Sequence, residues 1–515
     1  MRQTTDSISS AATSSETAVS YAGSTDKRSV SLSGVLPEAR FFSGRDIACD
    51  EYLDDLKDAP EGDWQGKLIV YRIGKVDPML VVAAAMARGA AGILTEQVLP
   101  CPLPQCIVPD VEHALGKLDA ALLHRPDRKL LTVGVVGSAG KTTTSLLVST
   151  VLRGAGIRVA YQNDLGECDG VVQVTPETRR NGGSPLIRWI GEAVDADSQA
   201  AIIELSEDHL RRGDYDAIEF DVLIMTGTTS NQDDFGPAAL SCAIEQLTRD
   251  GIVIVSADDK VGARLVADAG VRTITYGLRG AADVSGKIID QSDHITTSLI
   301  TYDDTTLAME TALCGSAMAA NHLAAIAFGL LIDRPLTVVV EALGVVRELP
   351  GRNQRLTHEQ AADVVLDVAR TPVQVAAALR AARSMRGSGK LWCVLAIDAD
   401  HDALQLTQFG RLMERFADHA IVTSSHDAKP SFLKRSHDVL DGVQKCAAFR
   451  LVADQNRAID WAMQEAGDLD TVLVLGGVSA RSARQQRTDL ETLANKIETA
   501  SREHANPRPA FRVVG

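Results

Sequence analysis

Residues 131–153, LTVGVVGSAGKTTTSLLVSTVLR, constrain this chain more than any other stretch of its sequence. An apolar run from Leu131 to Val136 predicts a β-strand, a Gly-Ser-Ala-Gly turn follows, and the apolar residues after Lys141 recur at helical spacing. A helix that begins directly after such a turn presents free backbone N–H groups, and these groups bind phosphate. The stretch therefore predicts a strand, a phosphate-binding loop and a helix.

The residues of the loop suit a nucleotide phosphate and its metal ion. Glycine lets the backbone approach phosphate oxygens because no side chain intervenes. Lys141 is expected to reach the β- and γ-phosphates, and Thr142 to offer its hydroxyl to Mg²⁺. A glycine-rich helix start that binds nothing is the alternative, although packing does not explain a lysine followed by three threonines. The predicted nucleotide-binding residues here are Gly137, Ser138, Ala139, Gly140, Lys141, Thr142 and Thr143.

The composition is typical of a soluble globular protein with several domains. The chain has 515 residues, 45% of them hydrophobic and 23% charged, so two to four domains are expected. A net charge of −16 argues against nucleic acid as the main partner, because binding phosphate backbones needs a basic surface. No apolar run is long enough for a membrane span, and the N-terminus lacks a secretory signal, so we expect a cytoplasmic protein.

Sequence pattern divides the chain into a tail and three predicted domains of α/β class. Residues 1–28 are rich in Ser, Thr and Ala, which predicts a disordered tail. Residues 29–128 alternate short β-type runs with a helix, as in a small α/β domain. Residues 129–352 predict a central domain whose mostly parallel sheet carries the phosphate-binding loop and helices on both faces. Residues 353–515 predict a C-terminal Rossmann-like domain.

Further strands and one helix are expected in the last two domains. In the central domain each apolar run ends in polar residues, and the carboxyl ends of strands are where open α/β sheets bind ligands. Short alternating strands at 283–312 predict an antiparallel flap, and residues 319–331 a helix. The runs that predict strands are 200–205, 222–226 and 252–256 in the central domain and 363–366, 391–397, 420–423 and 471–475 in the C-terminal one.

Glu204 is the most informative of these polar strand ends. A carboxylate inside the apolar run AAIIEL is costly unless it meets a cation. A Mg²⁺ ion beside the nucleotide would supply that cation. The alternative is a salt bridge to Arg211 or Arg212.

The order of these motifs resembles that of the Mur ligase family, and within it the UDP-N-acetylmuramoyl-tripeptide synthetases. The resemblance covers nearly everything after the tail. It includes a small N-terminal domain, GVVGSAGKTTT, AIIELSEDHLRRGDYDAIEFDVLIMTGTTSNQDD, the segment SADD, the helix with Asn321 and the ELPGR hinge. The resemblance implies an ATP-dependent amide-bond ligase of peptidoglycan assembly. ATP would phosphorylate a substrate carboxylate, and an amino acid would attack the acyl phosphate.

The resemblance also implies cofactors, partners and single residues. ATP and Mg²⁺ are the implied cofactors, and a UDP-sugar peptide and an amino acid are the implied small-molecule substrates of a monomer. The first of these substrates would use the N-terminal domain. Lys141 and Glu204 match the catalytic positions, and Thr142 and Glu204 the metal-binding ones. The other matches are Asn321, Arg352 and Asp367 for the nucleotide, and Thr175 and Pro176 for the UDP-sugar substrate.

The chain departs from the family pattern at several positions. The lysine that the family carbamylates would lie between Gly236 and Leu247, where this chain has no lysine and only Glu245 offers a carboxylate. The segment that selects the amino acid has become residues 425–428, Ser-His-Asp-Ala. A bidentate arginine is not replaced by a neutral side chain, so the amino-acid specificity does not carry over. The other departures are Met318, Asn231, Gln232, Val368, Arg370 and residues 476–480.

Three functions are consistent with this sequence. The first is an active ligase of this family with an altered amino-acid acceptor. The second is a catalytically weakened or inactive homologue that binds ATP or a UDP-sugar peptide in a regulatory or scaffold role. The third is a P-loop ATPase or kinase unrelated to cell-wall chemistry.

Overall fold

The computed structural model describes residues 29–54, 62–175, 183–228, 236–292, 294–356, 362–385, 387–425, 431–478 and 482–505. The expected tail, 1–28, lies outside them. The chain divides between Pro109 and Asp110 into two compact units, whereas the sequence-based boundary was placed at 128/129. Helix α3 (Val111–Leu122) accounts for the difference, because it packs against α5 (Gly183–Asp195) of the second unit. The three domain limits stay a prediction.

The first unit is built on a small, mostly parallel sheet. Its strand order is β2-β7-β6-β5-β4, and only the edge strand β2 runs antiparallel to its neighbour. Helix α2 (Pro78–Ala87) begins where the Asp77 side chain accepts the N–H of Met79. The remaining elements of this unit are β1 (Val30–Ser31), α1 (Leu32–Val35), β2 (Arg40–Phe42), β3 (Ala48–Cys49), β4 (Glu51–Leu53), β5 (Lys67–Val70), β6 (Gly92–Thr95) and β7 (Gln105–Ile107).

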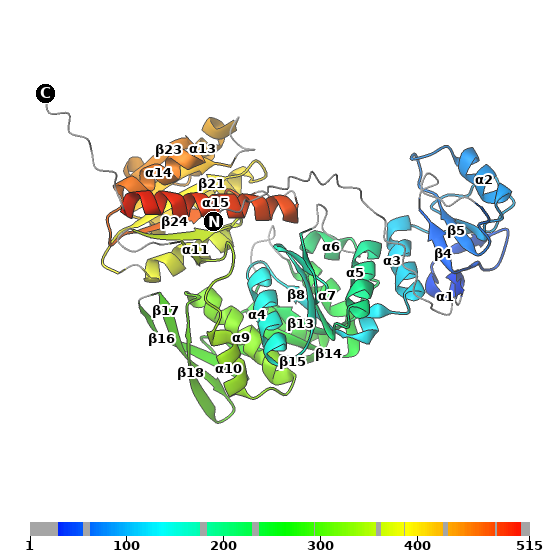
Figure 1. The fold of residues 1–515 in the computed structure, drawn as a ribbon, viewed down its shortest axis with the longest axis horizontal. Helices are drawn as coiled ribbons and strands as arrows, with labels where there is room; N and C mark the ends of the chain where they lie inside the picture. The colour runs from blue at the N-terminus through cyan, green and yellow to red at the C-terminus, as the bar shows by residue number, and fades with distance from the viewer. Residues whose placement is uncertain are drawn as a thin grey trace, which may run out of the picture. The chain divides into compact units, whose positions relative to one another are not determined.

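A large sheet forms the centre of the second unit (Figure 1). Among the described residues it has eleven strands, in the order β11-β10-β9-β12-β8-β13-β14-β15-β16-β17-β18. The strands from β9 to β16 in this order are parallel, and β17 and β18 form the expected antiparallel flap. The bounds are β8 (Leu131–Val136), β9 (Val159–Asn163), β10 (Gly166–Cys168), β11 (Gln173–Val174), β12 (Ala200–Glu204), β13 (Phe220–Met225), β14 (Leu247–Ser256), β15 (Arg272–Gly277), β16 (Val284–Ser292), β17 (Ile295–Tyr302) and β18 (Thr305–Thr311).

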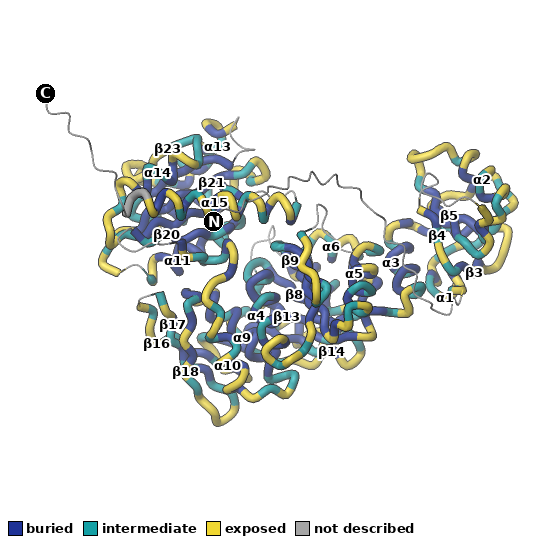
Figure 2. The backbone as a smooth tube through the Cα atoms, in the orientation of Figure 1, coloured by how far each residue is buried: buried dark blue, intermediate teal, exposed yellow. Residues whose placement is uncertain are grey.

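Helices cover both faces of this sheet. Successive strand residues point to opposite faces, so Val135 joins one hydrophobic core and Val136 the other. Helices α4 (Lys141–Gly154), α9 (Ser316–Leu331) and α10 (Leu336–Gly344) pack on the first face. Helices α5, α7 (Pro237–Glu245) and α8 (Lys260–Ala269) pack on the second, near the short α6 (Glu207–Arg211). Strands β8 and β13 are therefore among the most buried parts of the chain (Figure 2).

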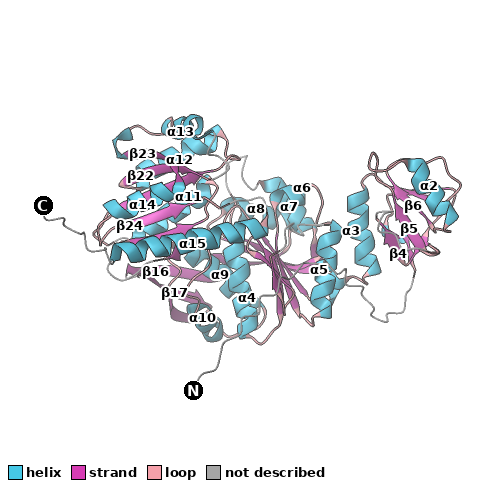
Figure 3. Cartoon of the chain, turned by 45° about the horizontal axis from the view of Figure 1, so that its top comes forward, coloured by secondary structure: helices cyan, strands magenta, loops and turns pink. Residues whose placement is uncertain are grey.

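The C-terminal sheet has the order β19-β20-β24-β21-β22-β23, parallel except for β19. Figure 3 shows its strands β22, β23 and β24 among the helices of this part of the chain. Helices α11 (Pro372–Met385), α12 (Ala403–Phe416) and α13 (Phe432–Leu440) pack on one face, and α14 (Gln455–Glu465) and α15 (Ala483–Ala505) on the other. The strands are β19 (Gln354–Arg355), β20 (Asp363–Asp367), β21 (Leu391–Ile397), β22 (His419–Ser424), β23 (Phe449–Asp454) and β24 (Thr471–Leu475). Short 3₁₀ helices cover Pro126–Lys129 and Cys446–Ala448.

The predicted α/β class is confirmed, including the phosphate-loop sheet with helices on both faces and the Rossmann-like C-terminal sheet. In the part of the chain that the structure describes, no helix is both long enough and apolar enough to cross a membrane.

Candidate functional site

The loop between β8 and α4 has a backbone that only glycine accepts easily at two positions. Gly137 has φ 141° and Gly140 has φ 86°, which L side chains rarely adopt. A Cβ at Gly140 would lie 2.5 Å from Oδ1 of Asn321, and one at Gly137 would clash with Oγ1 of Thr226. The loop is therefore packed between helix α9 and the end of β13. Asn321, which the family resemblance assigned to the nucleotide, lies against it.

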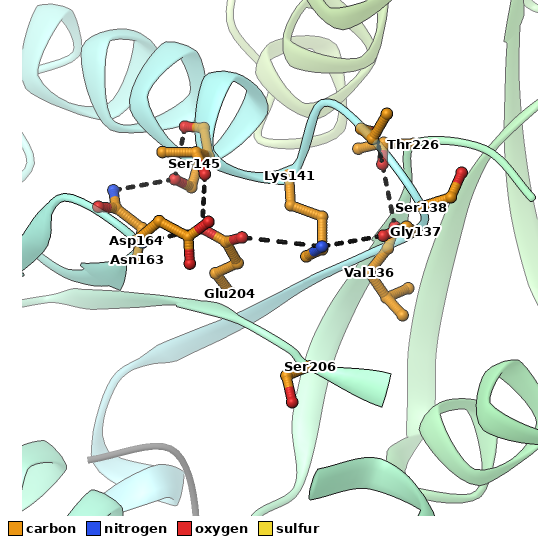
Figure 4. A network of polar contacts seen from close by, with 12 residues as sticks. Val136, Gly137, Ser138, Lys141, Ser145, Asn163, Asp164, Glu204, Ser206 and Thr226 are labelled. Atoms are coloured by element: carbon orange, nitrogen blue, oxygen red, sulfur yellow. Dashed lines mark hydrogen bonds and ion pairs between the residues drawn. The ribbon is translucent and has the colours of Figure 1, made fainter. Parts of the chain in front are cut away.

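Hydrogen bonds hold the loop in this shape (Figure 4). The N–H of Ser138 donates to the carbonyl of Gly227 at 3.0 Å, and the Thr226 hydroxyl donates to the carbonyl of Ala139 at 2.6 Å. Thr143 is buried inside α4. The chain's own groups therefore hold the loop and the N-terminus of α4.

Lys141 and Glu204 face each other at the mouth of the loop (Figure 4), and Thr142 joins them. Lys141 Nζ donates to the carbonyl of Gly137 at 3.0 Å and lies 3.8 Å from Glu204 Oε1. The Thr142 hydroxyl donates to Glu204 Oε2 at 2.9 Å. Glu204 is only 5% exposed at the end of its apolar strand, and Lys141 provides a cation close to its carboxylate.

The two arginines considered as partners of Glu204 make other ion pairs. Arg211 pairs with Glu207, and Arg212 Nε lies 3.2 Å from Asp214 Oδ2. Both arginines belong to the exposed segment after β12. The carboxylate of Glu204 therefore faces the phosphate loop and its lysine.

The hinge after α10 brings another predicted residue, Arg352, to the loop, and predicted Asp367 lies next to this hinge. Arg352 Nη2 donates to the Thr142 hydroxyl at 3.2 Å. Asp367, at the end of β20, accepts the N–H of Asn353 at 2.9 Å. Burial raises the pKa of Asp367 to about 6, against the opposing effects of Arg352 and of backbone hydrogen bonds. A carboxyl group with this pKa changes its charge near neutral pH, next to an arginine that contacts the loop.

Other residues predicted for the site lie elsewhere or outside the described residues. The Thr175 hydroxyl, at the end of β11, accepts a hydrogen bond from Arg487 of α15 at 3.2 Å. Three other residues lie outside the described ranges, namely Pro176, Asn231 and Gln232. Glu245 is exposed at the end of α7, and Gln246 alone separates it from the start of β14. Since β14 and β8 run in the same direction, Glu245 lies at the amino edge of the sheet, opposite the phosphate loop.

Some contacts of the loop were not anticipated from the sequence. Gln374 of α11 donates from Nε2 to the carbonyl of Ser138 at 3.4 Å. Asp259, part of the SADD segment, accepts the N–H of Thr228 at 2.7 Å and so fixes the residues after β13. Asp164 follows β9 beside Glu204 and was also missed, although a polar residue at a strand's carboxyl end was a usable signal.

Comparison with known proteins assigns the chain to a family. The family model described as Mur ligase middle domain matches residues 135–329, and the model described as Mur ligase, glutamate ligase domain, matches residues 351–478. The UDP-N-acetylmuramoyl-L-alanyl-D-glutamate--2,6-diaminopimelate ligase of Thermosynechococcus vestitus is 31% identical over 412 residues, which cover 76% of this chain and 81% of the relative.

Solved structures agree with this assignment at the level of the fold. A structure of a UDP-N-acetylmuramoyl-L-alanyl-D-glutamate--2,6-diaminopimelate ligase has a TM-score of 0.62 at 18% identity, covering 90% of this chain and 99% of its own. The MurF ligase of Thermotoga maritima in complex with ADP has a TM-score of 0.59 at 16% identity, covering 88% of this chain and 98% of its own. The resemblance expected from the sequence is confirmed, and the chain belongs to the Mur ligase family.

Proposed function

We propose that this protein is an ATP-dependent amide-bond ligase that joins an amino acid to the carboxylate of a UDP-N-acetylmuramoyl-peptide-like substrate. The observation that carries the proposal is the convergence of Lys141, Thr142 and Glu204 at the N-terminus of α4. This arrangement suits the γ-phosphate of a nucleotide. The name of the Thermosynechococcus relative supports the substrate class, and the ADP complex of the MurF neighbour supports the nucleotide.

The residues at the loop also fit Mg²⁺. This ion prefers oxygen ligands and keeps waters and substrate phosphates among them, so one hydroxyl and one or two carboxylates from the protein suffice. The Thr142 hydroxyl and the Glu204 carboxylate are such donors, and they lie 2.9 Å apart. Among the described residues no cluster of three His, Cys, Asp or Glu forms a metal site without a nucleotide. When bound, Mg²⁺ would neutralise phosphate charge during phosphoryl transfer.

The chain's own groups have separate tasks in the proposed reaction. Lys141 and the N–H groups at the start of α4 bind the phosphates and stabilise the charge that develops on the transferred phosphoryl group. Arg352 adds a second cation at the same place. The carboxylate of the first substrate attacks the γ-phosphate, ADP leaves, and the amino group of the second substrate then displaces phosphate from the acyl phosphate. Gln374 of the C-terminal domain contacts the loop, and such contacts would help to exclude water from this intermediate.

A phosphate-release assay on the full chain tests the proposal. We expect ATP turnover only when both a UDP-muramoyl-peptide and an amino acid from a panel are present, with an amide product of matching mass. ATP binding without turnover for any pair would overturn it in favour of a regulatory homologue. Turnover that needs no second substrate would overturn it in favour of a simple ATPase. We also propose that the protein is a monomer and that it is located in the cytoplasm.

A further inference from the structure

Asp164 lies at the same sheet edge as Glu204, on the neighbouring strand. Strand β9 ends at Asn163, directly before Asp164, and β12 ends at Glu204. The two strands are parallel neighbours, with Gln162 opposite Ile203. Since parallel strands end at a common edge, the two carboxylates come side by side next to the phosphate loop.

Direct contacts tie Asp164 to this site (Figure 4). Its backbone N–H donates to Glu204 Oε2 at 3.1 Å, the same oxygen that accepts the hydroxyl of Thr142. Its Oδ2 lies 3.8 Å from Nη2 of Arg352, and that nitrogen also donates to the Thr142 hydroxyl at 3.2 Å. Arg352 thus bridges the Asp164 carboxylate and the hydroxyl that is expected to bind a metal ion.

The turn that carries Asp164 is fixed from two sides. Asn163 is 1% exposed; its amide donates to Ser145 Oγ of α4 at 3.2 Å and its Oδ1 accepts the N–H of Leu165 at 2.9 Å. Leu165 packs against the hydrophobic core of the C-terminal domain that includes Val478. The position of Asp164 is therefore set by the phosphate-loop helix and by the docked C-terminal domain together.

Charge at this edge depends on whether a nucleotide is bound. Without one, two carboxylates, Glu204 and Asp164, face two cations, Lys141 and Arg352. Polyphosphate oxygens compete for both cations, because they carry more negative charge than one carboxylate. The carboxylates then need another cation close to Thr142, and a hard divalent ion suits a set of oxygen donors.

We infer that Asp164 is a second carboxylate of the nucleotide–metal site, paired with Arg352 until a divalent cation arrives with ATP. The inference rests on the proposed use of ATP with Mg²⁺ and adds a residue to it. Asp164 acts on the metal ion, either directly or through a bound water, and not on the substrates that become joined.

The Asp164→Asn variant of the full chain tests the inference. It keeps the backbone N–H to Glu204 and the size of the side chain but removes the charge. Mn²⁺ bound in the presence of a non-hydrolysable ATP analogue is measured by electron paramagnetic resonance, and analogue binding without metal by calorimetry. We expect about a tenfold or greater loss of Mn²⁺ affinity, and metal-free analogue binding that is unchanged or tighter.

Glu245→Gln is the matched control, because it removes one exposed carboxylate at the opposite edge of the same sheet. It should bind Mn²⁺ like the wild type. Wild-type Mn²⁺ affinity in Asp164→Asn would overturn the inference. If Asp164→Asn lowers the melting temperature, Asp164→Glu decides: recovery of Mn²⁺ affinity supports a carboxylate role, and no recovery in a folded variant overturns it. Mn²⁺ affinity is measured without any ligase reaction. The inference about Asp164 can therefore be supported or overturned even if the protein shows no ligase activity.

Discussion

The carboxyl edges of the central and C-terminal sheets differ in how their buried polar groups are satisfied. At the central edge Lys141, Thr142 and Glu204 bind one another, although the buried hydroxyl of Thr144, in the first turn of α4, has no hydrogen-bond partner among the described residues. At the C-terminal edge, by contrast, Ser425 Oγ, Arg435 Nε and Gln455 Nε2 are shielded from water and have no hydrogen-bond partner among the described residues. A buried polar atom without a partner costs about 1–3 kcal/mol, so such groups call for an explanation at a site.

The difference indicates two kinds of site in one protein. The central edge, where we propose that the nucleotide binds and which we call the nucleotide edge, is held by the chain's own contacts, and such preorganisation lowers the cost of reaching a transition state. The buried polar groups at the C-terminal edge have no such partners among the described residues, which do not include 426–430 and 479–481. Two departures from the family pattern include described residues at this second edge, namely Ser425 after β22 and residues 476–478 after β24. Amino-acid specificity is therefore the property in which we expect this chain to differ from its relatives.

Loss of the phosphate-loop lysine is expected to have the largest effect. Lys141→Ala removes the cation at the mouth of the loop, and loss of one such electrostatic contact typically costs about 10²–10³-fold in rate. Substrate-dependent phosphate release measures it. Lys260→Ala, at the exposed start of α8, should keep the wild-type rate. A Lys141→Ala variant with more than half of the wild-type rate would show that the nucleotide edge is not the reaction centre.

A methyl group at Gly140 tests whether the loop really needs its packed shape. Gly140→Ala forces a φ of 86° on an L side chain, which costs about 1–2 kcal/mol, and places Cβ 2.5 Å from Asn321 Oδ1. We expect about a tenfold weaker affinity for ATP by calorimetry. Gly280→Ala is the control, since no atom lies within 4 Å of the new Cβ. Equal ATP affinity in Gly140→Ala and the wild type would contradict a preorganised loop.

Local pattern in the sequence was enough to predict the nucleotide edge. The β-type run, the glycines and the helical spacing after Lys141 are short-range signals, and each corresponds to an element of the structure. Glu204 was found because a carboxylate in an apolar run is rare. Strand β23 was missed, since its Arg450 and Leu451 are exposed at the sheet edge and do not form an apolar run.

Contacts between distant segments could not be worked out from local pattern, although the family resemblance did assign Arg352 to the nucleotide. Arg352 reaches Thr142, and Gln374 reaches Ser138, only because the C-terminal sheet docks on the loop. Glu245 lies at the amino edge of the sheet, opposite the phosphate loop, because of the direction of the strands and the point at which α7 ends. The C-terminal edge was least predictable, because its buried polar groups come from different strands and helices.

Acid should lower the free energy of unfolding through His322, which follows Asn321 in α9. Burial lowers the pKa of His322 to about 4, from 6.5, and its ring contacts the carbonyl of Met318 at 2.8 Å. The unfolded chain binds this proton at higher pH than the folded one. The free energy of unfolding is therefore highest above pH 6.5 and decreases as the pH falls toward 4. At pH 5 the decrease is about 2 kcal/mol.

The His322→Leu variant isolates this effect because all other titrating groups are shared with the wild type. We expect the melting temperature of the wild type, measured by calorimetry, to fall relative to that of the variant between pH 7 and pH 5. A difference between the two proteins that does not change with pH would contradict the neutral, buried histidine.

The smallest expected effect is at the C-terminal edge, and it tests the comparison most directly. Ser425→Ala deletes a buried hydroxyl that has no partner among the described residues, so the free energy of unfolding should change by less than about 1 kcal/mol, or rise. Thr142→Val deletes a hydroxyl that binds Glu204, so this variant should lower the free energy of unfolding by about 1–3 kcal/mol. Urea unfolding of both variants measures the pair. If Ser425→Ala costs as much as Thr142→Val, the serine has a partner in the free protein, and the C-terminal edge is then as complete before substrate binding as the nucleotide edge.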